Sequence, residues 1–323
     1  MKKLMGALCT TALLSLTGTC ALAQQAYPSK PIKLVVPFGP GGFTDVVARI
    51  LGQKLGETLG QSVVIENKPG AGSMIGTDQV AKAAADGHTL LIVSSTHVIS
   101  PWIYKNIPYD PIKSFTTVTK LVDSPYVLLT NPKVPAKNVQ EFITLAKAQP
   151  NKIHYASSGN GSAQHLIGGL FASMTGTQLK HVPYRSSNLA ATDLVAGVVE
   201  SSFAGVPNAL AQVPNGRLNA LAVTSAKRIA QLPNVPTMQE AGVAGYDATI
   251  WLAMLAPAGT PKEIVNRLNS EVAKIMNTAE TKKAMFDAGV EVSLSTPEAM
   301  TQLMVSELDK WGKVVKEAGI KLE

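Results

Sequence analysis

The stretch IKLVVPFGPGGFTD at residues 32–45 decides the fold class of this chain. It opens on a β-branched apolar run at 32–36, which is typical of a strand buried on both faces of a sheet. A loop rich in Gly and Pro follows, and residues 44–59 then place apolar side chains at helical spacing. The stretch therefore predicts a strand, a loop and a helix in direct succession.

The same alternation of strand and helix continues along the chain. In the first half it predicts strands at 63–66 and 89–93 around a helix at 75–85. In the second half it predicts strands at 153–157, 179–183 and 198–203, with helices at 162–175 and 189–197. This order predicts an α/β protein with largely parallel, doubly wound sheets flanked by helices.

The length of 323 residues suits about two domains. Because the pattern repeats, we expect a clamshell of two similar lobes, although two unrelated α/β domains would give the same pattern. Lobe 1 is predicted at 27–123 plus 250–323, and lobe 2 at 124–249. The natural crossover strands, which would form the hinge, are the extended stretches 124–131 and 249–256.

Two amphipathic helices, at 261–277 and 296–318, end the chain and are expected to pack on the first lobe. Thr260 and Thr296 are their expected N-caps, each followed by a proline that suits the first helical turn.

The first 23 residues read as a signal peptide. Lys2 and Lys3 precede an apolar segment at 4–16 that is too short to span a bilayer, and cleavage is expected after Ala23. A lipoprotein anchored through Cys20 is the alternative. No later segment is apolar for long enough to be a transmembrane helix.

Composition excludes several classes of function. Both cysteines, Cys9 and Cys20, lie in the predicted signal peptide, so the mature chain has no disulfide, thiol nucleophile or Cys-ligated metal. The formal charge of +7 becomes +5 without Lys2 and Lys3, and its cations are scattered rather than clustered as nucleic-acid binding would require. The five histidines are dispersed, and no nucleophile–base pair or metal-binding motif can be assembled. We predict no catalytic residue, no metal and no cofactor, and therefore not an enzyme.

Each half places a polar Gly-containing loop between its first strand and first helix, at 37–45 and 157–162. In an open α/β sheet ligands bind outside the carboxyl ends of the parallel strands, and helix N-termini accept carboxylate or phosphate oxygens. Two such loops would grip an anion from both sides. The plainer interpretation makes them turns, with Thr44 and Ser162 as N-caps and Asp45 paired with Arg49.

A glycine motif at 70–76 is similar to a dinucleotide fingerprint but has one residue too many before its last glycine. Residues 68 and 69 separate it from the preceding strand, and no acidic residue ends the next strand. We therefore do not predict a nucleotide site.

Several motifs together resemble those of the tripartite tricarboxylate transporter receptors, the TctC or Bug family. They are VPFGPGGFTDVVAR at 36–49, ENKPGAG at 66–72, ADGHTL at 85–90, PYDP at 108–111, HVPYR at 181–185, LPNVPT at 232–237 and APAGTP at 256–261. The resemblance spans nearly the whole mature chain. It implies a periplasmic-binding-protein (Venus flytrap) fold in the periplasm, a small carboxylate ligand, and a membrane permease of one large and one small subunit as partner. We expect a monomer.

Carried onto matching positions, the resemblance implies a pocket built from loops and strand ends of both lobes. The expected ligand-binding residues are Phe38, Gly41, Gly42, Phe43, Thr44, Asp45, Ser95, Thr96, Ser157, Ser158, Asn160, Gly161, Ser162, His165, Tyr184, Arg185, Phe203 and Ala204.

Two departures from the family pattern bear on the ligand. Residues 186–188 are Ser-Ser-Asn where the family often has glycines, and Ala204 stands where an acid is common. Losing that acid favours a plain dicarboxylate or aromatic acid over a ligand with an amino group. A receptor that signals to a sensor protein, and a doubly wound α/β enzyme, are the alternative functions.

Overall fold

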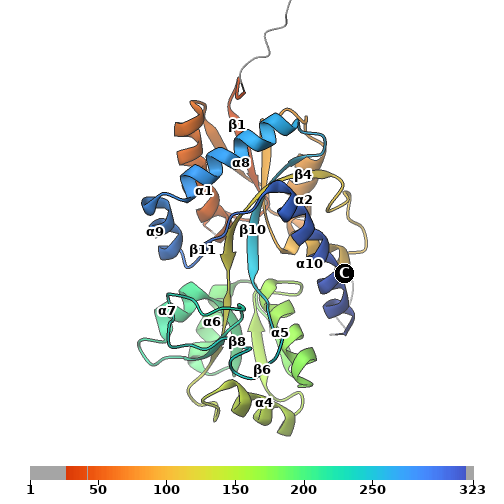
Figure 1. Cartoon of the computed structure of the whole chain (residues 1–323). Coiled ribbons are helices and arrows are strands. Elements are labelled where there is room, and N and C mark those ends of the chain that lie inside the picture. Colours follow the sequence, from red (N-terminus) through yellow and green to blue (C-terminus); the bar gives the residue numbers. More distant parts are fainter. Residues whose placement is uncertain (1–26, 42, 318–323) are drawn as a thin grey trace, which may run out of the picture.

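The computed structural model describes residues 27–41 and 43–317 and divides the chain into two lobes, each built on one sheet with helices on its faces (Figure 1). The predicted signal peptide and Gly42 lie outside the described residues. Among the helices that are described, none combines the length and apolarity needed to cross a membrane.

The first sheet has six strands in the order β11-β4-β10-β3-β1-β2. β1 pairs in parallel with β2 and β3, whereas β10 runs antiparallel to β3 and β4. The strands are β1 (Ile32–Val36), β2 (Val63–Asn67), β3 (Thr89–Ser94), β4 (Phe115–Ser124), β10 (Ile250–Pro257) and β11 (Glu291–Val292).

Helices cover both faces of this sheet. Leu34 and Leu51 share one buried cluster with Leu268 and Val272, so the helix after β1 and a helix from the end of the chain pack on the same face. The helices of this lobe are α1 (Phe43–Leu59), η1 (Ala71–Ser73), α2 (Met74–Ala81), α3 (Thr96–Ile99), η2 (Ser100–Trp102), α8 (Lys262–Met276), α9 (Ala279–Asp287) and α10 (Pro297–Glu317).

The second sheet has five strands in the order β7-β6-β8-β5-β9. Its strands are β5 (Tyr126–Thr130), β6 (His154–Ser157), β7 (Lys180–Pro183), β8 (Ser201–Gly205) and β9 (Asn219–Val223). Its helices are α4 (Val139–Ala148), α5 (Ala163–Thr175), α6 (Ser187–Ala196) and α7 (Val206–Gln212). Phe142, Phe171 and Phe203 form the aromatic centre of its core, and all three are fully buried.

The α/β fold with two lobes is confirmed, but the sheets are mixed rather than largely parallel. Parallel pairing is confined to the strand–helix–strand units, such as β1 with β3 and β6 with β8. The chain passes from one lobe to the other at Pro125, between β4 and β5, and returns just before β10. β4 runs toward the hinge, whereas β5 and β10 enter their sheets from it, so β10 pairs antiparallel to β3 and β4, and β5 pairs antiparallel to β8.

Local predictions hold best where apolar periodicity is strong. The strand at 32–36 is found with the predicted bounds, and Thr296 caps α10 by accepting a hydrogen bond from Ala299 N–H at 3.1 Å. Three details are wrong. The strand predicted at 198–203 lies at Ser201–Gly205. The second helix ends at Ala81 rather than at 85, and Thr260 does not cap α8, because its hydroxyl instead donates to Pro257 O at 2.8 Å.

The last helix, α10, contacts both lobes. Met300 and Met304 pack against the first sheet, whereas Trp311 lies in the core cluster of the second lobe with Phe171. The helix also packs on the first lobe in its C-terminal half, where Trp102 Nε1 donates to Leu308 O at 2.8 Å. What the sequence did not predict is the additional contact with the second lobe.

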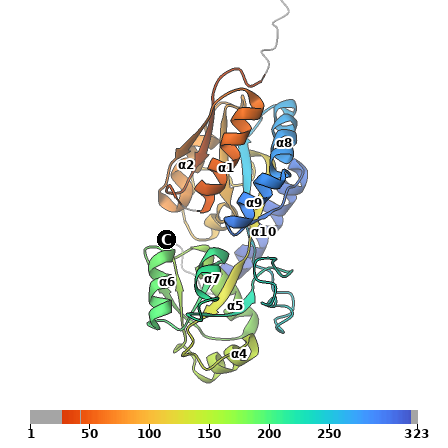
Figure 2. The ribbon, with the colours of Figure 1, turned by 90° about the vertical axis from the view of Figure 1, so that its left-hand side faces the viewer.

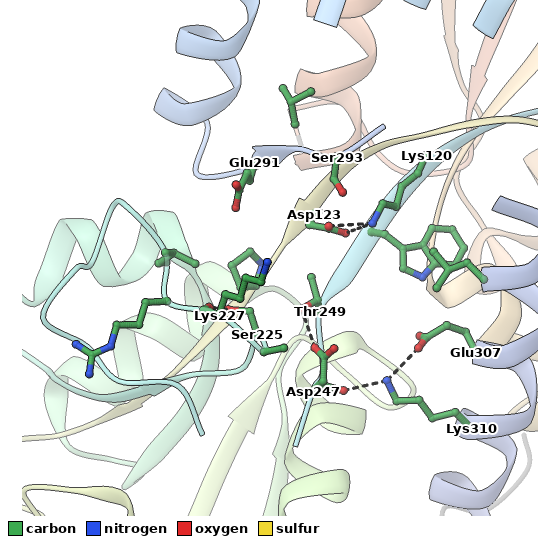
Figure 3. A pocket seen from close by; sticks show the side chains of 17 residues that line it. Lys120, Asp123, Ser225, Lys227, Asp247, Thr249, Glu291, Ser293, Glu307 and Lys310 are labelled. Carbon is green, nitrogen blue, oxygen red and sulfur yellow. Dashed lines mark hydrogen bonds and ion pairs between the residues drawn. The ribbon is translucent and has the colours of Figure 1, made fainter. Parts of the chain in front are cut away.

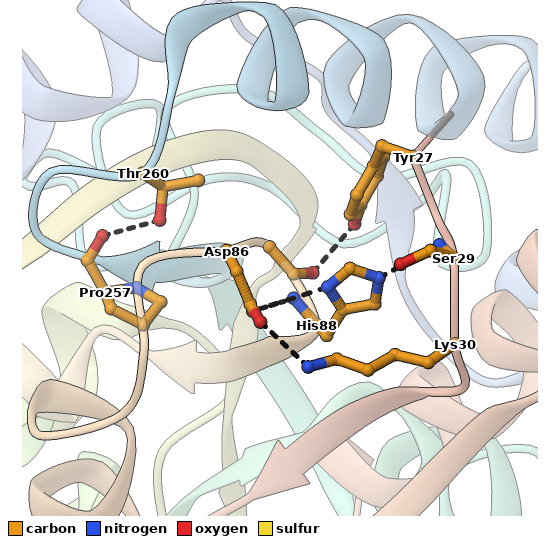
Figure 4. A network of polar contacts seen from close by, with 8 residues as sticks. Tyr27, Ser29, Lys30, Asp86, His88, Pro257 and Thr260 are labelled. Atoms are coloured by element: carbon orange, nitrogen blue, oxygen red, sulfur yellow. Dashed lines mark hydrogen bonds and ion pairs between the residues drawn. The ribbon is translucent and has the colours of Figure 1, made fainter. Parts of the chain in front are cut away.

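The described N-terminus is fastened to the first lobe through residues 86–88 (Figure 4). Tyr27 hydroxyl donates to Gly87 O at 2.7 Å, Ser29 N–H donates to His88 Nε2 at 3.2 Å, and Lys30 pairs with Asp86 at 2.9 Å. His88 therefore has a structural role, which is to hold the described N-terminus on the first lobe. It lies outside both predicted ligand loops in the sequence.

Candidate functional site

The carboxylate of Asp45 holds the loop after β1 in place through hydrogen bonds. Asp45, in the first turn of α1, is 2% exposed and accepts from Gly41 N–H at 2.8 Å, Arg49 Nε at 2.8 Å and Asn67 Nδ2 at 2.9 Å. Asn67 also donates to Phe38 O at 3.1 Å. Burial acts to raise the pKa of Asp45, but these hydrogen bonds outweigh it and hold the pKa below its ordinary value.

Asp45 therefore orders the loop rather than offering a charge to a ligand. Phe38, Gly41 and Phe43 remain partly or fully exposed around it, while Thr44 is buried. Gly41 takes φ +75°, a value that a residue with a side chain rarely adopts. Gly42 lies outside the described residues.

The end of β3 adds small hydroxyl groups to the same edge of the sheet. Ser94 and Thr96 hydroxyls lie 2.7 Å apart. Ser95 is fully buried, and its hydroxyl has no hydrogen-bond partner among the described residues. Of the two predicted ligand-binding residues at this strand end, Ser95 and Thr96, only Thr96 is partly exposed.

In the second lobe the loop after β6 is closed by one of its own side chains and by two side chains from the first turn of α5. Ser157 hydroxyl donates to Gly159 O at 3.0 Å, and Ser158 N–H donates to Gln164 Oε1 at 2.9 Å. Gly161 N–H donates to His165 Nδ1 at 3.1 Å. The loop amides thus serve the loop itself, and its anion-binding capacity moves to the first turn of α5.

That first turn is capped at one point. Ser162 hydroxyl accepts from His165 N–H at 3.3 Å, and the sequence prediction of Ser162 as N-cap is confirmed. A helix N-terminus has more N–H groups than one cap can satisfy, so those of Ala163 and Gln164 remain for an anion at the positive end of the dipole.

Two histidines stack beneath this loop. The rings of His165 and His181 lie 3.8 Å apart at 7°, and His181 Nε2 contacts the Ser157 hydroxyl. Burial, with a smaller contribution from His165, lowers the pKa of His181 to about 4. A neutral imidazole is therefore part of the folded loop.

The remaining predicted residues differ in what they can reach. Tyr184 hydroxyl donates to Asp193 at 2.8 Å, and burial followed by that carboxylate raises the pKa of Tyr184 to about 12. Arg185 is exposed, and its guanidinium has no partner among the described residues. Phe203 and Ala204 are buried in β8 and supply packing.

The two groups of loops lie at facing edges of the lobes. A Cβ placed on Gly161 would come within 3.1 Å of Ile103 of the first lobe, and Ile99 and Ile103 share a buried cluster with Tyr155 and Phe203. The start of α5 thus lies beside the seam between the lobes. α1 begins at the hinge-side end of the first sheet, because β1 runs parallel to β3, whose last residue Ser94 pairs with Leu252 near the start of β10. Residues 27–41 and 43–317 contain no group of three or more His, Cys, Asp or Glu that could hold a metal ion.

Sequence reasoning missed the residues that hold these loops in shape. Asn67 and His181 bind loop atoms from neighbouring strands, and Gln164 binds them from the helix after the loop. Asn67 and His181 lie in the motifs at 66–72 and 181–185, but nothing in those motifs indicates that they hold a loop in shape. It also missed a separate pocket of about 390 Å³ beside the crossover strands, which shares no residue with the predicted site (Figure 3).

Comparison with known proteins identifies the family of this chain. The profile of the family described as "Tripartite tricarboxylate transporter family receptor" matches residues 47–320. Protein BugT of Bordetella pertussis is 37% identical over 304 residues, covering 94% of this chain and 93% of BugT.

Solved structures of similar sequence share the fold over nearly the whole chain. The periplasmic binding protein BugD is 36% identical with a TM-score of 0.78, covering 92% of this chain and 100% of its own. Rpa4515 of R. palustris with adipate is 36% identical with a TM-score of 0.81 and the same coverage. MatC from Rhodopseudomonas palustris with bound malate is 31% identical with a TM-score of 0.77, covering 90% and 100%. This chain therefore belongs to the tripartite tricarboxylate transporter receptor family, whose members are solute-binding receptors and not enzymes.

Proposed function

We propose that the protein is a periplasmic receptor that captures a small carboxylate between its lobes and delivers it to a membrane permease of one large and one small subunit. The observation that carries the proposal is the pair of helix N-termini, α1 and α5, one from each lobe, at the seam where the lobes face each other. Neighbours of similar sequence hold adipate and malate, both dicarboxylates.

A dicarboxylate suits this arrangement because it can place one anionic end at each helix start. Free N–H groups of a helix's first turn accept carboxylate oxygens, and the helix dipole adds a favourable interaction of about 0.3–1 kcal/mol at each end. The exposed Arg185 lies next to Tyr184, whose carbonyl is 3.6 Å from a Cβ placed on Gly159. We propose that its guanidinium closes over the bound carboxylate.

The ligand is expected to lack an amino group. The end of β8 carries Ala204, which is 3% exposed, and no carboxylate there could pair with an ammonium. Asp45, the one acid of the first ligand loop, is already occupied by Gly41, Arg49 and Asn67. Succinate, adipate, malate and benzoate should therefore outcompete aspartate and glutamate.

A thermal-shift screen of chain 24–323 against these acids, followed by calorimetric titration, tests the proposal. A ligand that binds only the folded state raises the melting temperature by mass action. A specific rise with one plain carboxylate class supports the proposal, and binding of an amino acid alone, or of no carboxylate, overturns it.

Arg185→Gln locates the binding site. Losing a charged hydrogen bond of about 1.5–3 kcal/mol should weaken carboxylate binding about tenfold or more. Arg217→Gln removes the same charge from an exposed position beyond α7 and should leave affinity unchanged. Equal weakening by both variants would mean that only net charge matters.

A further inference from the structure

The pocket beside the crossover strands is built by both lobes (Figure 3). Its first-lobe wall comes from β4, β10, β11 and α10, and its second-lobe wall from the segment 225–229 and Asp247. Figure 2 shows α8, α9 and α10 on the opposite side of the molecule from α2 and α6. The lining of the pocket includes residues of α10 and β11 and none of the predicted ligand loops. A volume of about 390 Å³ is within the range of small-molecule sites.

Opposite charges are balanced around the pocket, with four Lys or Arg and four Asp or Glu in its lining. Some of these satisfy each other. Lys120 pairs with Asp123 at 2.9 Å, and Lys310 Nζ binds both Glu307 at 2.9 Å and Asp247 O at 2.9 Å. Because these side chains are already paired with each other, they form the walls of the pocket and do not offer free charges to a ligand.

Other polar groups of the pocket have no ion-pair partner in the part of the chain that the structure describes. Lys227 contributes a free ammonium, and Glu291 and Asp247 contribute carboxylates, of which Asp247 accepts only from Thr249 at 3.1 Å. Trp251 also lines the pocket, is 2% exposed, and has an indole N–H without an acceptor. A buried donor without a partner costs roughly 1–3 kcal/mol, so an acceptor at this wall would be favoured.

We propose that this pocket is a second binding site for a small zwitterion, a molecule with an ammonium and a carboxylate separated by a short chain. The ammonium would pair with Glu291 and Asp247, one from each lobe, and the carboxylate would accept from Lys227 and the Trp251 N–H. A zwitterion meets unpaired groups of both signs in the lining, whereas a simple anion or cation leaves one set of these groups unpaired.

Because both lobes form the site, its shape depends on the angle between them. A ligand with different affinity for the open and closed forms shifts their populations and changes affinity at the other site by the same factor. The hinge site would therefore tune carboxylate capture without contacting the carboxylate.

Calorimetric titration of chain 24–323 with 4-aminobutyrate tests this inference, with butyrate and butylamine as probes that carry only one charge. We expect 4-aminobutyrate to bind and to weaken about tenfold or more in Glu291→Gln and in Trp251→Phe, which keeps the ring and removes the donor. Glu298→Gln, an exposed acid of α10 outside the pocket, should bind as the parent does. Circular dichroism confirms that each variant is folded.

Three results would overturn the inference. One is the absence of binding up to about 10 mM 4-aminobutyrate, a level that detects even weak affinity. Another is equal binding of butylamine, which would make the site a plain cation site. The third is weakening by Arg185→Gln rather than by Glu291→Gln, which would place the zwitterion between the ligand loops instead.

Discussion

A single carboxylate, that of Asp45, connects the loop after β1 to two neighbouring elements, because it accepts from Gly41, Arg49 and Asn67 at once. Asp45→Asn should lower the free energy of unfolding by about 2 kcal/mol, since charged hydrogen bonds at a buried site are lost. Urea unfolding at pH 7 measures this. Asp287→Asn breaks an exposed pair with Lys283 at the same i,i+4 spacing and should cost about 0.5 kcal/mol or less. Equal costs would contradict the role given to Asp45.

The His165–His181 stack sets a pH dependence at the second loop. The pKa of His181 is about 4 in the folded protein and 6.5 in the unfolded chain. Between these two pH values the unfolded chain therefore binds more protons than the folded protein does. Stability is therefore fully present above about pH 6.5 and falls as the pH drops toward 4. When the pH is lowered from 7 to 5, the free energy of unfolding should fall by about 2 kcal/mol less in His181→Gln than in the parent protein. Urea unfolding at both pH values checks this, and an unchanged loss would exclude a neutral buried imidazole.

At the scale of elements, α10 fastens the lobes together. Trp311 is fully buried in the second-lobe core, and its Nε1 donates to Glu307 at 2.7 Å, while the start of the helix packs on the first sheet. Trp311→Ala should cost about 3–5 kcal/mol in urea unfolding, as large core truncations do. Val305→Ala, at a 45% exposed site of the same helix, should cost about 0.5 kcal/mol or less. A small cost for Trp311→Ala would mean that α10 only rests on the second lobe.

Elements with strong apolar periodicity were predictable, and their partners were not. The apolar run at 32–36 predicts a buried strand because both of its faces are apolar, and β1 has the same bounds. The pairing direction of β10 depends on how the chain returns through the hinge, which no local pattern records. The two ligand loops could be found by their place between strand and helix. The side chains that brace them, such as Asn67 and His181, come from neighbouring strands whose approach only the fold determines.

For the molecule as a whole, we expect the two lobes to close on an anion that is held at the starts of α1 and α5. Two extended connections at the hinge and the bridging helix α10 join the lobes (Figure 1). We expect closure to be a rotation of one lobe against the other about these connections. Hinge motions of this kind use few residues and leave each lobe's core intact.

The most direct test is to record backbone amide signals of ¹⁵N-labelled chain 24–323 during titration with adipate and malate. We expect the largest shifts on Thr44 and Asp45 in one lobe and on Ala163 and Gln164 in the other, together and at the same ligand concentration. Large shifts at only one of these helix starts, or confined to other parts of the chain, would contradict capture of a carboxylate between the two lobes.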